Sequence, residues 1–103
     1  MGDIAPEYGA MTVSVQHRYY GESMPFPEFG QDGDFKDLSK TGYLTSEQAL
    51  ADVAQIITHI KETVTGAQDS PVIVFGGSYA GMLAAWARIK YPHLIDGQDF
   101  CFK

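Results

Sequence analysis

Ser78 lies in the segment FGGSYAGM, where small residues surround it on both sides. Gly76 and Ala80 flank it at a distance of two positions, and Gly77 and Gly81 stand beside them. A serine in a G-x-S-x-G pattern is typical of a nucleophile on a sharp turn between a strand and a helix, where the strained backbone passes close to its neighbours. Alanine in place of the second glycine adds only a methyl group. The pattern predicts that Ser78 is a nucleophile for acyl transfer.

The elements that this chemistry requires are predicted on both sides of Ser78. Residues 71–76 begin with PVIVF, a run that is apolar on both faces and typical of a strand in a covered parallel sheet. Residues 79–91 show a helical pattern, which Pro92 ends. Because a helix directs its first amides toward its N-terminus, we expect the Tyr79 N–H to donate to an oxyanion formed at Ser78.

A phosphate-binding turn is the alternative use of these glycines. The chain has no G-x-x-x-x-G-K-[ST] motif, and GGSYAG does not have the spacing of G-x-G-x-x-G. A glycine-rich turn that only packs tightly remains the simpler alternative to a nucleophile.

The remaining pattern predicts an α/β chain. Residues 3–10 indicate the end of a helix, the alternating apolar residues in 11–17 predict a strand, and 22–44 read as a long loop rich in proline and glycine. A capping box, TSEQ at 45–48, precedes a predicted helix over 46–65. The apolar residues of this helix form one stripe along its surface: Leu50, Val53, Ile57, Ile60 and Val64. Strands separated by helices predict a parallel sheet with crossover helices.

Composition excludes several classes of function. The chain has 103 residues, enough for one small domain, and a net charge of −6 without a basic patch, which argues against nucleic-acid binding. One cysteine, Cys101, cannot form an internal disulfide, and the three histidines lack the spacing of metal ligands, so we expect no metal or other cofactor. No apolar run is long enough to span a membrane, and the first residues do not have the pattern of a signal peptide.

Four blocks of the sequence resemble the prolyl carboxypeptidase and dipeptidyl peptidase II family of serine exopeptidases. They are HRYYGES (17–23), YLTSEQALAD (43–52), GGSYAGMLAAW (76–86) and KYPHLIDG (90–97). The blocks stand in the order and spacing of the family and together extend over most of the chain. The residues of the YYGES and LAAW segments are more similar to the Pro-X carboxypeptidase branch than to the dipeptidyl peptidase branch.

The resemblance implies a partial α/β-hydrolase fold with an incomplete sheet, in which Ser78 is the nucleophile of a Ser–Asp–His triad and Tyr79 supplies a backbone oxyanion donor. It implies cleavage beside a penultimate proline at a peptide terminus, a lysosomal or secreted location, and leaves room for a homodimer of the full-length enzyme. It also predicts that the chain is an internal part of a longer enzyme, that the triad Asp and His lie outside it, and that QDFCFK replaces the family's next strand.

The histidines of this chain are poor candidates for the catalytic base. His93 follows Ser78 by fifteen residues along a helix, which places it about 20 Å away. His59 is expected on the helix surface. Only His17 is predicted to end a strand at the same edge of the sheet as Ser78, and Glu22 is the group that would orient it. The missing central strand would lie between the strands of His17 and Ser78 and separate them by about 10 Å. Three carboxylates are expected at the wrong edge of the sheet: Asp69, Asp96 and Asp99.

The sequence therefore predicts a serine exopeptidase nucleophile in a chain that is inactive by itself. Without the central strand, two buried strands would expose edges and faces, so we expect marginal stability, aggregation or dependence on a partner. Three alternatives stay open: a non-catalytic product that binds a partner, a dipeptidyl peptidase II-like enzyme, and a general esterase or lipase.

Overall fold

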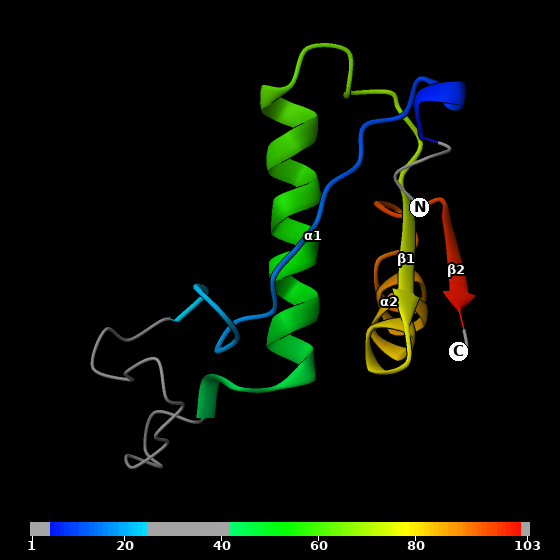
Figure 1. Cartoon of the computed structure of the whole chain (residues 1–103). Helices are drawn as coiled ribbons and strands as arrows, with labels where there is room; N and C mark the ends of the chain where they lie inside the picture. Colours follow the sequence, from blue (N-terminus) through cyan, green and yellow to red (C-terminus); the bar gives the residue numbers. More distant parts are fainter. Residues whose placement is uncertain (1–4, 25–41, 102–103) are drawn as a thin grey trace. The chain divides into compact units, whose positions relative to one another are not determined.

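The computed structural model describes residues 5–24 and 42–101 of the chain, the last two of these by their backbone alone. Along the chain it contains a short 3₁₀ helix (Ala5–Tyr8), α1 (Ser46–Thr63), β1 (Ile73–Gly77), α2 (Tyr79–Lys90) and β2 (Gly97–Cys101), as Figure 1 shows. Residues 1–34 and 35–103 form two compact units, and each is described by itself.

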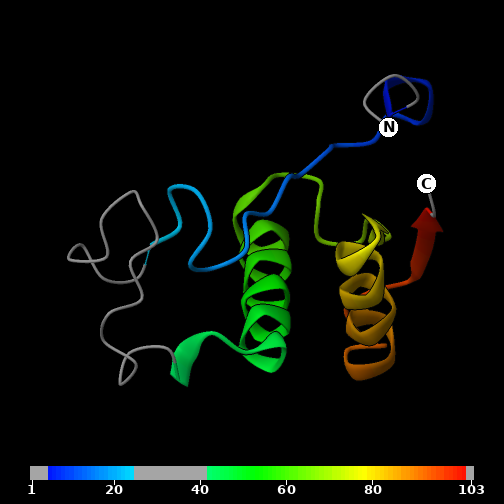
Figure 2. The same cartoon turned by 60° about the horizontal axis from the view of Figure 1, so that its bottom comes forward.

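The larger unit is built on a two-stranded parallel sheet. β1 and β2 pair in the register Ile73 with Gly97 through Gly77 with Cys101, and α2 is the crossover between them. α2 lies against one face of this sheet (Figures 1 and 2). The chain is thus an α/β structure of two parallel strands and two helices in its described part.

β2 is a strand that the sequence analysis did not anticipate. Residues 97–101 read GQDFC, which has neither alternation nor a β-branched residue. The strand exists because its backbone continues the ladder with β1, and because the Asp96 carboxylate accepts a hydrogen bond from the Val72 N–H at 2.8 Å. Residues 98–101 of the predicted replacement segment QDFCFK thus pair as a strand, and its last two residues lie outside the described range.

The strand predicted over 11–17 is wrong for this structure. These residues have no regular secondary structure, and the alternating side chains of Met11, Val13 and Val15 are exposed. A strand requires a hydrogen-bonded neighbour, and none of the described residues pairs with this segment. The predicted helix end at 3–10 is a single 3₁₀ turn, followed by Gly9 with φ 60°. Most of the predicted loop over 22–44 lies outside the described residues.

α1 begins at its predicted cap. Thr45 has an extended backbone, and its hydroxyl accepts a hydrogen bond from the Gln48 N–H at 3.2 Å. In the first turn, a hydrogen bond from its own backbone N–H holds the pKa of the Glu47 carboxyl below its ordinary value, and the Ser46 and Thr45 hydroxyls and Lys90 act in the same direction. The helix ends at Thr63, two residues before the predicted end, and a turn containing Gly66 (φ 87°) follows.

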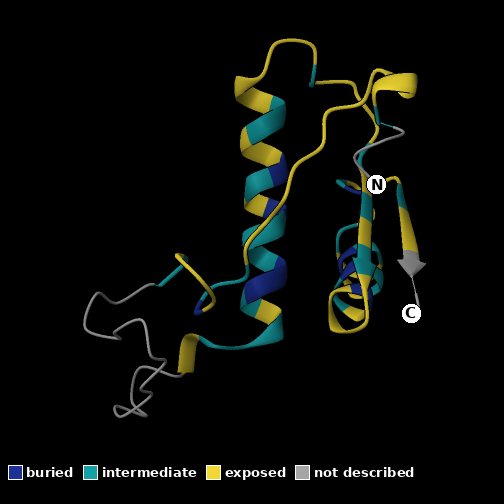
Figure 3. Ribbon diagram, in the orientation of Figure 1, coloured by how far each residue is buried: buried dark blue, intermediate teal, exposed yellow. Residues whose placement is uncertain are grey.

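The hydrophobic core of the larger unit lies between the two helices and the sheet. Its buried members are Leu50, Ile57, Ala87 and Ile95, and partly buried side chains such as Val72 and Val74 pack against them. In Figure 3 the buried positions of α1 follow one side of the helix, as its apolar stripe predicted. The core holds α2 in place, and with it the turn at Ser78.

Candidate active site

Ser78 is the single residue between the end of β1 and the start of α2. Its backbone angles are φ 52° and ψ −123°, a conformation that residues with a side chain rarely adopt. Such a residue costs about 1–3 kcal/mol and persists only where the surrounding structure holds it. The Ser78 side chain is exposed. The backbone therefore turns sharply at the one residue that the sequence predicts to be reactive.

Gly76 permits this turn because α2 passes directly over it. A Cβ atom built on Gly76 would overlap the carbonyl group of Ala80 and lie 2.6 Å from the Gly81 nitrogen. The first turn of α2 and the last residues of β1 are thus in backbone contact, and no side chain fits between them. Gly81 is itself buried. Gly76 is thus a predicted small residue whose missing side chain the geometry requires.

The N-terminus of α2 presents a positive electrostatic field at Ser78. The Ser78 carbonyl accepts the first helical hydrogen bonds, from the Gly81 N–H (3.0 Å) and the Met82 N–H (3.2 Å). Its hydroxyl makes no capping hydrogen bond. The first turn contains no acidic residue, whereas the last turn contains Arg88 and Lys90, so the charges follow the helix dipole. Negative charge that develops beside Ser78 would meet this field without a competing carboxylate in the first turn.

The histidines of the larger unit do not approach this turn. His93 lies beyond the C-terminal end of α2, whereas Ser78 lies at its N-terminal end, and a helix of 12 residues is about 18 Å long. Its ring contacts Tyr91 instead, at 6.3 Å between the centroids. His59 is exposed in the second half of α1. Neither imidazole is placed to accept a proton from the Ser78 hydroxyl.

Two of the three carboxylates considered in the sequence analysis lie at the start of β1, away from Ser78. Asp96 bonds to the Val72 N–H at the beginning of β1, the end opposite to Ser78. Asp69 precedes the same strand and is exposed. Asp99 is not at that edge, contrary to the prediction: it lies within β2 and pairs with Phe75, three residues before Ser78.

His17 and Glu22 belong to the smaller unit. The His17 Nδ1 donates to the Arg18 carbonyl at 2.7 Å, and its ring makes an edge contact with Tyr20 at 5.1 Å. The Glu22 N–H donates to the Gln16 side chain at 3.1 Å. These contacts are local ones within the turn of residues 16–23.

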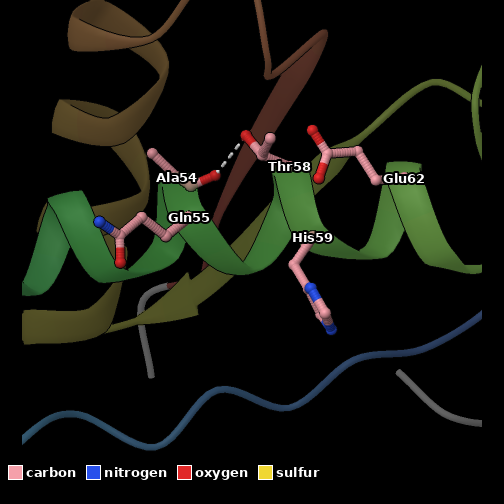
Figure 4. A pocket seen from close by; sticks show the side chains of 5 residues that line it. All are labelled: Ala54, Gln55, Thr58, His59 and Glu62. Atoms are coloured by element: carbon pink, nitrogen blue, oxygen red, sulfur yellow. Dashed lines mark hydrogen bonds between the residues drawn. The ribbon is translucent and has the colours of Figure 1, made fainter.

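A hollow that was not predicted from the sequence lies on α1. It has a volume of about 260 Å³ and is lined by Ala54, Gln55, Thr58, His59 and Glu62 (Figure 4). The Thr58 hydroxyl donates to the Ala54 carbonyl at 2.9 Å, so this side chain is engaged with its own helix. The lining comes from one helix, and none of it belongs to the Ser78 turn.

Across residues 5–24 and 42–101, no group of three metal-ligating side chains could hold a metal ion. None of the helices in these ranges combines the length and the apolar character that crossing a membrane requires.

Comparison with known proteins identifies the group to which the chain is related. Residues 1–98 match the family model of serine carboxypeptidase S28. The chain is 59% identical to the lysosomal Pro-X carboxypeptidase of Mus musculus and 57% identical to that of Homo sapiens, in both cases over 97 residues. It is 46% identical over 92 residues to the thymus-specific serine protease of Mus musculus.

These matches cover most of this chain and a small part of each relative. The carboxypeptidase matches include 94% of this chain and 19% of the relative, and the thymus-specific protease match includes 89% and 17%. The chain spans about a fifth of the length of the relatives it matches. Because the family model extends over 98 of its 103 residues, the chain belongs to the serine carboxypeptidase S28 family.

Proposed function

We propose that this chain carries the nucleophile of a serine exopeptidase, that Ser78 is that nucleophile, and that the two strands and two helices are part of an α/β-hydrolase sheet. The observation that carries the proposal is the positive φ of Ser78 between a strand and a helix, because a nucleophile elbow requires this strained backbone. The crossing of Gly76 by Ala80 supports it. Gly77, Ala80 and Gly81 complete the elbow.

In the proposed reaction, the Ser78 hydroxyl oxygen attacks the carbonyl carbon of the scissile peptide bond. A histidine base takes the hydroxyl proton and later delivers it to the leaving nitrogen, and an acyl-enzyme forms on Ser78. The Tyr79 N–H stabilises the oxyanion of the tetrahedral intermediate, together with the field of α2. Water then hydrolyses the acyl-enzyme. No cofactor takes part in this sequence.

The base is the group that the described residues of the larger unit do not place at the turn. His59 and His93 lie elsewhere in the same unit, so we propose that Ser78 in the isolated chain is weakly nucleophilic and that turnover requires a triad Asp and His from outside it. The substrate class is a peptide with proline beside the terminal residue. Relatives named lysosomal Pro-X carboxypeptidase favour cleavage at the carboxyl end, in a lysosomal compartment, over a dipeptidyl peptidase activity.

Chemical rescue tests the nucleophile directly. The chain is incubated with a fluorophosphonate probe, with and without imidazole as a soluble base, and the labelled residue is identified by mass spectrometry. We expect imidazole to accelerate labelling of Ser78 and the Ser78→Ala variant to lose it. The Ser70→Ala variant, which removes another exposed serine, serves as the matched control and should label normally.

The outcome that contradicts the proposal is equally specific. Labelling spread over several serines, or labelling unchanged in Ser78→Ala, would show that Ser78 has no special reactivity. The choice between the two exopeptidases is tested on a longer enzyme that contains this chain. Release of the last residue from a peptide ending in Pro-X supports the carboxypeptidase, and release of an X-Pro dipeptide from the amino end supports the dipeptidyl peptidase.

A further inference from the structure

Asp96 and Gly97 both bind Val72, the residue that precedes β1. The Asp96 carboxylate accepts a hydrogen bond from the Val72 N–H at 2.8 Å. The Val72 carbonyl in turn accepts hydrogen bonds from the Asp96 N–H at 2.8 Å and from the Gly97 N–H at 3.2 Å. Ile95, the preceding residue, is buried in the core. These hydrogen bonds, called the Val72 clamp below, join the start of β2 to the start of β1.

An aspartate that precedes a glycine can modify its own backbone. Such a pair occurs at residues 32–33 and 96–97, and the second lies within the described residues. The Gly97 nitrogen bonds to Cγ of the protonated Asp96 carboxyl, and the amide hydrogen leaves with the carboxyl hydroxyl as water. Water then opens the resulting succinimide ring. Attack at Cγ restores aspartate, whereas attack at the α-carbonyl gives isoaspartate, in which Gly97 is bonded to Cγ.

Glycine favours ring closure, and the Val72 clamp opposes it. Gly97 has no Cβ to shield its nitrogen, and its backbone turns freely. In the folded chain, however, the carboxylate is bound to the Val72 N–H and the Gly97 N–H is bound to the Val72 carbonyl. Both hydrogen bonds must break before the nitrogen can reach Cγ. The end of a strand opens locally at a lower free energy than the whole domain, so such openings occur without global unfolding.

We propose that the bond between Asp96 and Gly97 is a site of isoaspartate formation that the pairing of β1 and β2 controls. The closed clamp protects the bond, and each local opening exposes it to ring closure. Isoaspartate adds a carbon atom to the backbone before Gly97, which displaces Gly97 from its partner Ile73 in the register. The modification thus makes a transient opening of β2 a lasting one. This inference goes beyond the peptidase proposal and does not rest on Ser78.

Heavy-oxygen labelling of the unaltered chain tests the site. The chain is incubated at one pH in heavy-oxygen water, in buffer and in urea that unfolds it. Because each ring opening adds one heavy oxygen atom to residue 96, mass spectrometry counts both products, and electron-transfer fragmentation distinguishes isoaspartate from aspartate. Amide hydrogen exchange at Gly97 is measured in the same solutions and reports whether the clamp is closed.

The clamp predicts a protected Gly97 amide in buffer and a modification at least about tenfold slower there than in urea. Both rates should rise together as urea is added below the unfolding transition. The proposal is overturned if residue 96 forms no isoaspartate in urea, or if the Gly97 amide is unprotected in buffer. It is also overturned if the modification is as fast in buffer as in urea while that amide is protected.

Gly97→Ala is the matched control variant. A Cβ atom at this position would lie 3.7 Å from the Ile73 side chain, an ordinary contact, so the clamp should remain. The added methyl group shields the attacking nitrogen. The variant should therefore keep the exchange protection of residue 97 in buffer and lose most of the heavy-oxygen uptake at residue 96 in urea. Uptake that Gly97→Ala leaves unchanged would contradict ring closure through this nitrogen.

Discussion

The backbone of Ser78 has an energetic cost that a substitution can remove. Glycine adopts a φ of 52° without steric conflict, whereas alanine keeps most of the conflict of serine. Ser78→Gly should therefore raise the free energy of unfolding by about 1 kcal/mol, the strain relieved less the greater freedom of glycine in the unfolded chain. Urea denaturation measures the difference, and Ser78→Ala, expected close to wild type, is the control. A Ser78→Gly chain less stable than Ser78→Ala would contradict the strain.

Adding a side chain at Gly76 should destabilise the chain, because the Ala80 carbonyl leaves no space for it. Gly76→Ala forces a methyl group against the Ala80 carbonyl and should lower the free energy of unfolding by about 2 kcal/mol, through displaced backbone. Gly97→Ala is a matched change in β2, where the added Cβ would lie 3.7 Å from Ile73, an ordinary contact. Urea denaturation of both variants should show a large loss for the first and a small change for the second. Equal losses would mean that the strand, and not the crossing, determines the effect.

At the scale of the elements, the first turn of α1 predicts a dependence of stability on pH. The pKa of Glu47 is lowered in the folded chain, mainly by its own backbone N–H. Its contribution is therefore complete above the unfolded pKa of about 4.5 and is lost as the pH falls through the lower, folded value. A Glu47→Gln variant should show a weaker loss of stability over this acidic range. The measurement is the urea midpoint as a function of pH, and identical profiles for both chains would contradict the assignment.

The elements also show what the sequence could predict. The capping residue Thr45, the apolar stripe and the breaking Pro92 located both helices within two residues, because these signals are local. β2 was missed because its pairing depends on the backbone of β1, 24 residues earlier in the register. The segment 11–17 has the alternation of a strand, yet alternation cannot supply a partner. The position of Ser78 was predictable from its glycines, whereas its torsion angles depend on the crossing of two elements.

At the scale of the molecule, the core of the larger unit is small. Ile95, 1% exposed, is its most deeply buried large side chain. Ile95→Ala should cost about 2–5 kcal/mol, which is comparable to the whole stability of a small domain, so the cooperative unfolding transition should be lost. Ile89→Ala, at an exposed position, is the matched control and should stay within about 0.5 kcal/mol of wild type. Thermal unfolding followed by circular dichroism distinguishes the two, and a cooperative transition retained in Ile95→Ala would contradict this account of the core.

Because the proposed nucleophile at residue 78 has a strained backbone, selection for stability and selection for reactivity should favour different residues at this position. A library of variants at this position, sorted only for resistance to a protease during unfolding, should become enriched in glycine. The same library sorted for reaction with the fluorophosphonate probe should retain serine. Selection for stability alone would therefore replace the serine at this position by glycine. A protein that keeps serine at this torsion angle folds with a lower free energy of unfolding than its glycine variant.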